Sequence, residues 1–120
     1  MKPKAVIAGP KSGLTTHNPE VAFAVYPPKG EIVIGMRKRD TKNPEIHGTT
    51  DVPQTEDWSS YIAVWSINDN GDVPPHWTIG GPNGSFKSVA GVALDPKHKE
   101  VFATDTWTES VLTFYFPEIF

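Results

Sequence analysis

The stretch from Trp77 to Phe116, WTIGGPNGSFKSVAGVALDPKHKEVFATDTWTESVLTFYF, decides the fold class. Four short apolar runs follow one another in it, separated by turn-forming Gly, Pro, Asn, Asp and Lys. The runs are Trp77–Ile79, Val89–Leu94, Val101–Ala103 and Val111–Phe116. Such runs between turn residues, without a helical period, are typical of consecutive antiparallel strands joined by hairpins. The stretch therefore predicts an all-β fold.

The same unit occurs a second time, earlier in the chain. The matched segments are Ile7–Pro10 with Ile79–Pro82, Phe23–Pro27 with Val92–Pro96, Glu31–Val33 with Glu100–Phe102, and Ile62–Trp65 with Val111–Phe114. The offset falls from 72 and 69 residues in the first three pairs to 49 in the last. This difference indicates an insertion of about twenty residues in the first copy. We therefore predict two copies of a four-strand unit, over residues 1–75 and 76–120.

In the first copy, the pattern predicts strands at Lys4–Ala8, Val21–Tyr26, Glu31–Gly35 and Tyr61–Ile67. Residues 36–58, MRKRDTKNPEIHGTTDVPQTEDW, form the insertion. This segment is polar and contains prolines, so we expect an excursion loop and not a core element.

Composition and charge narrow the classes of partner. The net charge is −3 and basic residues form one small cluster, so no nucleic-acid partner is expected. The absence of cysteine excludes disulfides and Cys-ligated zinc. No apolar run reaches membrane-spanning length and no signal peptide is visible, so we expect no membrane partner. A cytoplasmic location follows if the chain is the complete natural product.

One motif carries a resemblance to a known family. Gly71–Pro82 reads GDVPPHWTIGGP, and a G-[VI]-A-[LV]-D strand and an E-[VI]-x-[VA] strand follow it. This order resembles the NHL-type β-propeller repeat, most closely that of bacterial propeller proteins with G-D-V-x-P-x-x-x-I-x-G-P repeats. The resemblance covers nearly the whole chain apart from the insertion. It implies two four-stranded antiparallel blades, with Val21–Tyr26 and Val89–Leu94 lining the channel. The first copy departs from the pattern, with Tyr26 where the second has Asp95.

The phase of the repeat leaves both ends of the chain unfinished. Residues 4–8 correspond to the outermost strand of a preceding blade, whereas Val111–Phe116 is a third strand without a fourth. Two blades cannot close a ring, and the open edges favour association. We therefore expect the strand at 4–8 to be donated to a neighbouring blade in a six-bladed homotrimer, with an eight-bladed tetramer as the alternative. A competing interpretation is that the chain is the C-terminal third of a longer propeller.

Candidate ligand groups fall in loops that a propeller gathers on one face. His17, Asn18 and Glu20 precede the first inner strand, where repetition around an axis would bring copies together. Such His, amide and carboxylate groups would suit a divalent cation such as Ca²⁺, in loose resemblance to calcium-dependent lactonase propellers. The alternative role for these residues is hydrogen bonding of the loop backbone.

Two further groups of side chains are candidates for ligand binding. Arg37, Arg39 and His47 of the insertion would suit an anion, with a solvated charged loop as the alternative. Exposed Trp58 or Trp107 would suit a carbohydrate, because an indole ring offers a stacking surface. Catalytic residues are not predicted, since no nucleophile has a recognisable base partner.

These observations favour a non-enzymatic scaffold or binding module, assembled from two-blade chains and without a required cofactor. The alternative is a metal-dependent hydrolase, similar to a lactonase, or a lyase with its site at the channel mouth. A chelator-sensitive thermal transition would favour the enzyme.

Overall fold

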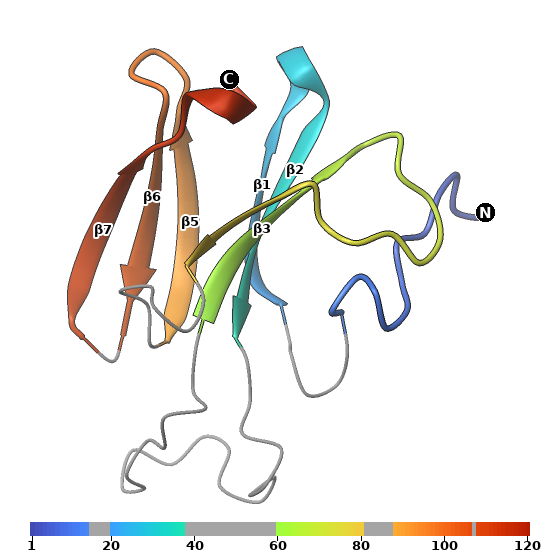
Figure 1. Ribbon diagram of the computed structural model, residues 1–120, viewed down its shortest axis with the longest axis horizontal. Helices are drawn as coiled ribbons and strands as arrows, with labels where there is room; N and C mark the ends of the chain where they lie inside the picture. The colour runs from blue at the N-terminus through green and yellow to red at the C-terminus, as the bar shows by residue number, and fades with distance from the viewer. Residues whose placement is uncertain (15–19, 38–59, 81–87, 107) are drawn as a thin grey trace, which may run out of the picture.

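The computed structural model describes residues 1–14, 20–37, 60–80, 88–106 and 108–120. Its strands are antiparallel and form two sheets that lie side by side (Figure 1). The first sheet has the order β1 (Glu20–Tyr26), β2 (Glu31–Arg37), β3 (Ser60–Ser66) and β4 (Trp77–Gly80). The second has the order β5 (Val89–Asp95), β6 (Glu100–Asp105) and β7 (Ser110–Tyr115). The all-β prediction is confirmed.

The turns that join these strands follow from their residues. Pro27–Lys29 form the 3-10 turn η1, because proline presets the backbone angle that a tight turn needs. Gly30 then adopts a left-handed conformation with φ of 63° and donates its N–H to the Pro27 carbonyl at 3.0 Å. A side chain disfavours this conformation, so glycine is suited to the position. The turn sets the register in which Tyr26 lies opposite Glu31.

Most predicted strands match observed strands within about two residues, the usual uncertainty of strand ends. Residues 4–8 are an exception, because the described chain has no regular strand there and only Ile7 forms an isolated bridge, with Gly71. The start of the insertion also needs correction. Met36 and Arg37 belong to β2, where they pair with Tyr61 and Ser60, and Met36 is fully buried.

Residues 77–80 lie in the first sheet, as the repeat phase predicts. Strand β4 pairs with β3, so that Ile79 lies opposite Ile62 and Trp77 opposite Val64. The sequence repeat that begins at residue 76 therefore supplies the last strand of the first sheet before it forms the second.

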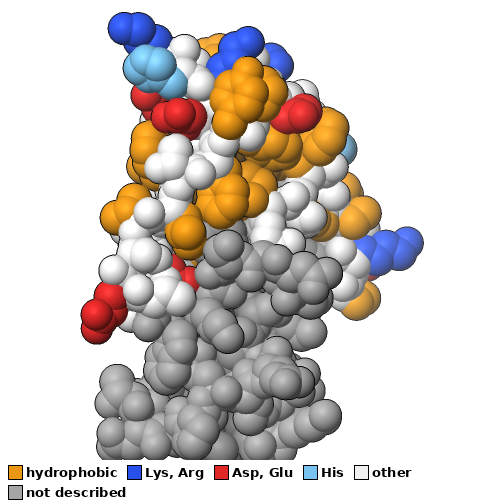
Figure 2. Space-filling model, turned by 60° about the vertical axis from the view of Figure 1, so that its left-hand side comes forward, with side chains coloured by type: hydrophobic (Ala, Val, Ile, Leu, Met, Phe, Trp, Pro, Cys, Tyr) orange, Lys and Arg blue, Asp and Glu red, His pale blue; other side chains and the backbone are white. Residues whose placement is uncertain are grey.

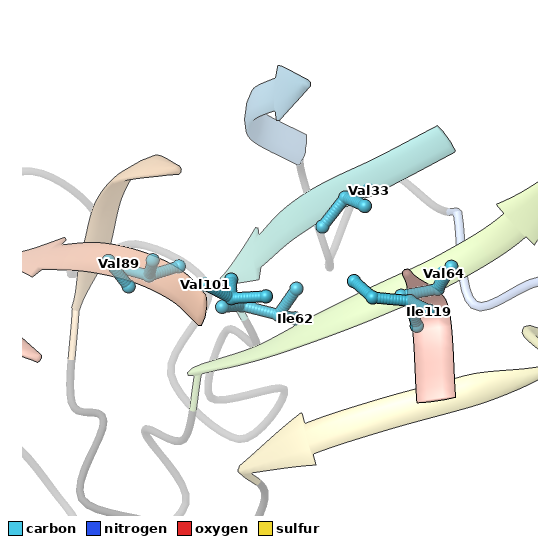
Figure 3. Close-up of a cluster of buried hydrophobic side chains, with 7 residues drawn as sticks. Val33, Ile62, Val64, Val89, Val101 and Ile119 are labelled. Carbon is cyan, nitrogen blue, oxygen red and sulfur yellow. The ribbon is translucent and has the colours of Figure 1, made fainter. Parts of the chain in front are cut away.

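The hydrophobic core lies between the two sheets. Figure 3 shows side chains from both sheets meeting there, with Val33, Ile62 and Val64 on one side and Val89 and Val101 on the other. The sheets approach each other closely at Gly35, where an added Cβ would lie 3.0 Å from Val92 Cγ2. A buried valine or isoleucine contributes roughly 1.5–3 kcal/mol relative to the exposed side chain. This interface is therefore the main stabilising contact between the sheets.

The C-terminal residues cover one end of this interface. The 3-10 turn η3 (Pro117–Ile119) follows β7 and places Ile119 in the core, fully buried beside Val64 (Figure 3). The Phe120 ring meets Tyr26 edge to face at 5.1 Å. Phe116 meets Trp77 in the same way at 5.8 Å. The chain end thus ties the second sheet to β1 and β4 of the first.

The N-terminal residues lie against their own chain. Val6 accepts a hydrogen bond at its carbonyl from Gly71 N–H at 2.6 Å, and Ala8 N–H donates to the Gly71 carbonyl at 3.1 Å. Asp72 Oδ1 accepts from Lys11 N–H at 2.8 Å and from Ser12 N–H at 3.2 Å. These bonds attach residues 6–12 to the turn between β3 and β4.

The described residues contain no helix of the length and apolar character needed to cross a membrane.

Candidate functional site

Most residues that the sequence analysis selected for ligand binding lie outside the described residues. They are His17, Asn18, Arg39, His47, Trp58 and Trp107. The backbone of two others is placed: Glu20 opens β1 opposite Met36, and Arg37 ends β2 opposite Ser60. Because β1 and β2 are antiparallel neighbours, Glu20 and Arg37 lie at the same end of the first sheet.

The corresponding end of the second sheet is held by a buried carboxylate. Asp105 ends β6 and is 2% exposed. Its Oδ2 accepts from Ser88 N–H at 3.1 Å, and its Oδ1 accepts from Thr108 N–H at 3.1 Å. Thr106 Oγ1 also donates to the Ser88 carbonyl. Because both carboxylate oxygens accept backbone N–H groups, we assign Asp105 a structural role, which the sequence analysis did not predict. Among the described residues, no cluster of His, Cys, Asp and Glu has the arrangement of a metal site.

A second polar group lies at the opposite end of the first sheet. Lys29, Glu31, His76 and Trp77 contribute to the lining of a pocket of about 220 Å³. Glu31 Oε2 is buried and has no hydrogen-bond partner in the described part of the chain. Its burial raises the pKa of Glu31, although the positive charges of Lys29 and His76 act in the other direction. His76 Nε2 lies 2.8 Å from Asp69 Oδ2. The sequence analysis did not predict this group, because its members come from two segments that lie far apart in the sequence.

Among the described residues, exposed apolar side chains lie on the outer faces of the two sheets, on the sides away from the core. Side chains alternate between the two faces of a strand, so the paired residues Val25, Ile32 and Trp65 share the outer face of the first sheet. The same holds for Phe23 and Ile34. Phe23 is 70% exposed and Val25 45%. This outer face is therefore apolar and partly open to solvent.

The N-terminal segment covers part of this outer face. Ile7 and Leu14 pack against the cluster formed by Met36, Ala63 and Trp65. A pocket of about 380 Å³ remains between the segment and the sheet. Its lining is mainly apolar and consists of Ala5, Ile7, Leu14, Ile32, Ile34, Trp65, Ile67 and Asp69.

The outer face of the second sheet is also apolar. Phe102 and Thr113 are paired on it, and Val111 and Tyr115 occupy neighbouring positions. Val111 is 67% exposed and Tyr115 71%. Figure 2, which brings the β7 side of the molecule forward, shows hydrophobic side chains in the open on this side. Large exposed apolar groups that share a face mark an interaction surface more often than a solvated one.

Repeat equivalence relates these open faces to the buried interface. At the offsets of 69 and 49 residues, Val33, Ile62 and Val64 of the core correspond to Phe102, Val111 and Thr113. On the other side of the core, Leu94, Val101 and Phe114 correspond to Val25, Ile32 and Trp65. Each outer face thus consists of the positions that the other copy of the repeat buries.

Comparisons of this chain with protein-family models, with curated proteins and with solved structures give no match.

Proposed function

We propose that this protein is a non-enzymatic scaffold or binding module that forms a β-propeller by head-to-tail association of two-blade chains. One observation carries the proposal: the positions that meet between the sheets correspond, by the repeat, to positions on the two outer faces, where Val25, Val111 and Thr113 remain exposed. An interface that forms once within the chain can therefore form again between chains. In such an arrangement, the outer face of the second sheet packs on the outer face of the first sheet of another copy.

The contact is heterologous, since it joins two different surfaces. Heterologous contacts produce a closed ring where the rotation between copies suits, and an open filament where it does not. Propellers close with about four to eight blades. Three two-blade chains give a six-bladed ring, which is the assembly we favour, and four chains give eight blades. Closure buries both outer faces of each chain at once.

A ring would place three copies of the Glu20 and Arg37 end of the sheet around one axis. Loops at one end of a rigid scaffold are the usual site of ligand recognition. We place the ligand surface there, and a small molecule or a carbohydrate are the classes that its residues suit. The alternative function, a metal-dependent hydrolase, would need the loop groups His17, Asn18 and Glu20 to hold a cation such as Ca²⁺.

Thermal unfolding over a wide range of protein concentrations tests the assembly. Association stabilises the folded state by mass action, so the Tm of an oligomer rises with chain concentration. We expect such a rise, and a Tm independent of concentration would contradict the proposal. The same measurement with added calcium or with a chelator separates the two functions. A scaffold keeps its Tm, whereas a calcium-dependent shift would support the enzyme.

A further inference from the structure

We infer that β7 of a second copy pairs with the N-terminal segment in one defined register, Val111 opposite Ile7 and Thr113 opposite Ala5, and that its side chains fill the pocket beside Trp65. The inference rests on the proposed assembly and adds to it the contacting atoms. Three independent features of the chain support it: the free edge of the segment, the free edge of β7, and the shape left between segment and sheet.

The N-terminal segment uses only one of its two edges. Residues in an extended chain direct both their N–H and C=O groups to the same side, and neighbouring residues direct them to opposite sides. Val6 and Ala8 direct theirs to Gly71, and Val6 N–H also donates to Asn70 Oδ1 at 2.9 Å. Ala5 and Ile7 therefore face the other way, and their backbone groups form no hydrogen bond with other described residues. The attached segment thus offers a second edge for pairing.

The open edge of β7 presents matching groups. Phe116 N–H donates to the Lys99 carbonyl at 2.9 Å, which continues the β6–β7 ladder and directs Phe116 toward β6. By alternation, Val111 and Thr113 direct their N–H and C=O groups away from β6. No strand of the described chain pairs with β7 on that side.

The pairing of β3 with β4 supplies the register. Ile67 N–H donates to the Gly30 carbonyl at 2.8 Å, so the backbone groups of Ile67 point toward β2. By alternation, the backbone groups of Ile62 and Val64 point the other way, toward β4. The hydrogen bond from His76 N–H to the Val64 carbonyl, at 2.8 Å, agrees with this direction. Ile62 lies opposite Ile79, and Val64 opposite Trp77.

The repeat equivalents of β3 residues lie 49 positions later in the chain, and those of β4 residues lie 72 positions earlier. The two pairs of β3 and β4 therefore predict Val111 opposite Ile7 and Thr113 opposite Ala5. All four are residues whose backbone groups face an open edge within the described part of the chain. The direction of the hydrogen bonds limits the register to steps of two residues, and the repeat offset, a separate observation, selects a register that meets this condition.

The position of the segment agrees with this pairing. Ala5 and Ile67 line one pocket. Their repeat equivalents are Trp77 and Phe116, whose rings are in contact at the buried interface. The segment therefore lies beside the first sheet as β4 lies beside the second. The N-terminal segment can be attached to its own chain and also pair with β7 of a second copy. Its hydrogen bonds to Gly71 use the edge opposite to the one that would face β7.

The pocket beside Trp65 lies where the side chains of a second copy would be placed by this pairing. At the buried interface, Ile62 and Val64 pack in one cluster with Ile79, Val101 and Phe114. The equivalent space beside Ile7, Ile32 and Trp65 is the pocket of about 380 Å³. The equivalents of Ile62 and Val64 are Val111 and Thr113 of a second copy. An aliphatic side chain and a threonine methyl group suit this apolar lining.

Engineered disulfides test the register directly, because the natural chain has no cysteine. The register places Ala8 opposite Ser110, the repeat equivalents of Gly80 and Tyr61. Facing residues in antiparallel strands have Cα atoms within the range that a disulfide requires. The test variant is therefore A8C with S110C. The matched control is A8C with T113C, whose positions are three residues out of register and on opposite faces.

The two variants are oxidised under mild conditions and their products separated by size under denaturing conditions without a reductant. We expect covalent oligomers, up to the closed ring, as the main product of A8C with S110C, and monomer from the control. Equal cross-linking of both variants would overturn the register. So would an absence of cross-links in a variant whose native mass shows that it assembles, and the proposed function would survive that result. A chain that remains monomeric before oxidation would overturn both proposals.

Discussion

A single carboxylate at Val111 should prevent association and leave the single chain folded. Val111 is 67% exposed in the isolated chain. Full burial of a valine contributes roughly 1.5–3 kcal/mol, so the part still exposed contributes about 1–2 kcal/mol to each interface between chains. V111D removes this contribution and also places a carboxylate in an apolar contact without a counter-ion. Burial of an unpaired charge costs several kcal/mol.

Together, these effects weaken each interface by about 4 kcal/mol, which corresponds to roughly a thousandfold in the dissociation constant. The free energy of unfolding of the monomer should change little, because the side chain is exposed there. Sedimentation over a range of concentrations measures association, and urea unfolding measures the fold. The control is K97D, a charge change on the exposed turn between β5 and β6. Association of V111D at the concentrations at which the natural chain associates would refute the reasoning.

Three other variants test separate parts of the structure. I62A should lower the free energy of unfolding by about 2–5 kcal/mol in urea titrations, because Ile62 is fully buried in the core. A loss below about 1 kcal/mol would contradict the buried interface. D72A removes the acceptor of the Lys11 N–H group, whereas the Ser12 N–H group also donates to the Gly9 carbonyl. Hydrogen exchange of the Lys11 amide should therefore accelerate by about fivefold, which corresponds to the loss of roughly 1 kcal/mol for one hydrogen bond. Unchanged protection would argue against the attachment of the N-terminal segment. E31Q should raise Tm at neutral pH, because the raised pKa of Glu31 means that ionisation of this carboxyl destabilises the folded state. This destabilisation is absent below the unfolded-state pKa of Glu31 and fully present above its folded-state pKa. The gain over the natural chain should therefore vanish in acid, and a gain that persists there would exclude Glu31 ionisation as its cause.

The strands were predictable because their signal is local. Apolar residues alternate with turn residues along the chain, and a repeat of the pattern identifies which strands are equivalent. The offsets even predicted that residues 77–80 belong to the sheet before them. The predicted start of the insertion was wrong at Met36 and Arg37. The pattern assigned both to the insertion, whereas backbone pairing with Tyr61 and Ser60 extends β2 through them.

Other features depend on contacts that a pattern does not contain. Asn70 and Asp72 lie in the connection between β3 and β4, yet their side chains accept backbone N–H groups of residues 6, 11 and 12. Those bonds hold residues 6–12 against their own chain, and residues 4–8 form no regular strand within the described part of it. The group of Glu31 and His76 was likewise unpredictable, because β-sheet pairing brings together residues that lie 45 positions apart in the sequence.

Native mass spectrometry of the natural chain tests the central claim most directly. The chain mass is 13.2 kDa. Face-to-face association with closure at six blades predicts a dominant species of three chains, and closure at eight blades predicts one of four. A single-chain species that persists at high concentration would show that the repeat positions buried within the chain do not form a second interface, and would contradict the account.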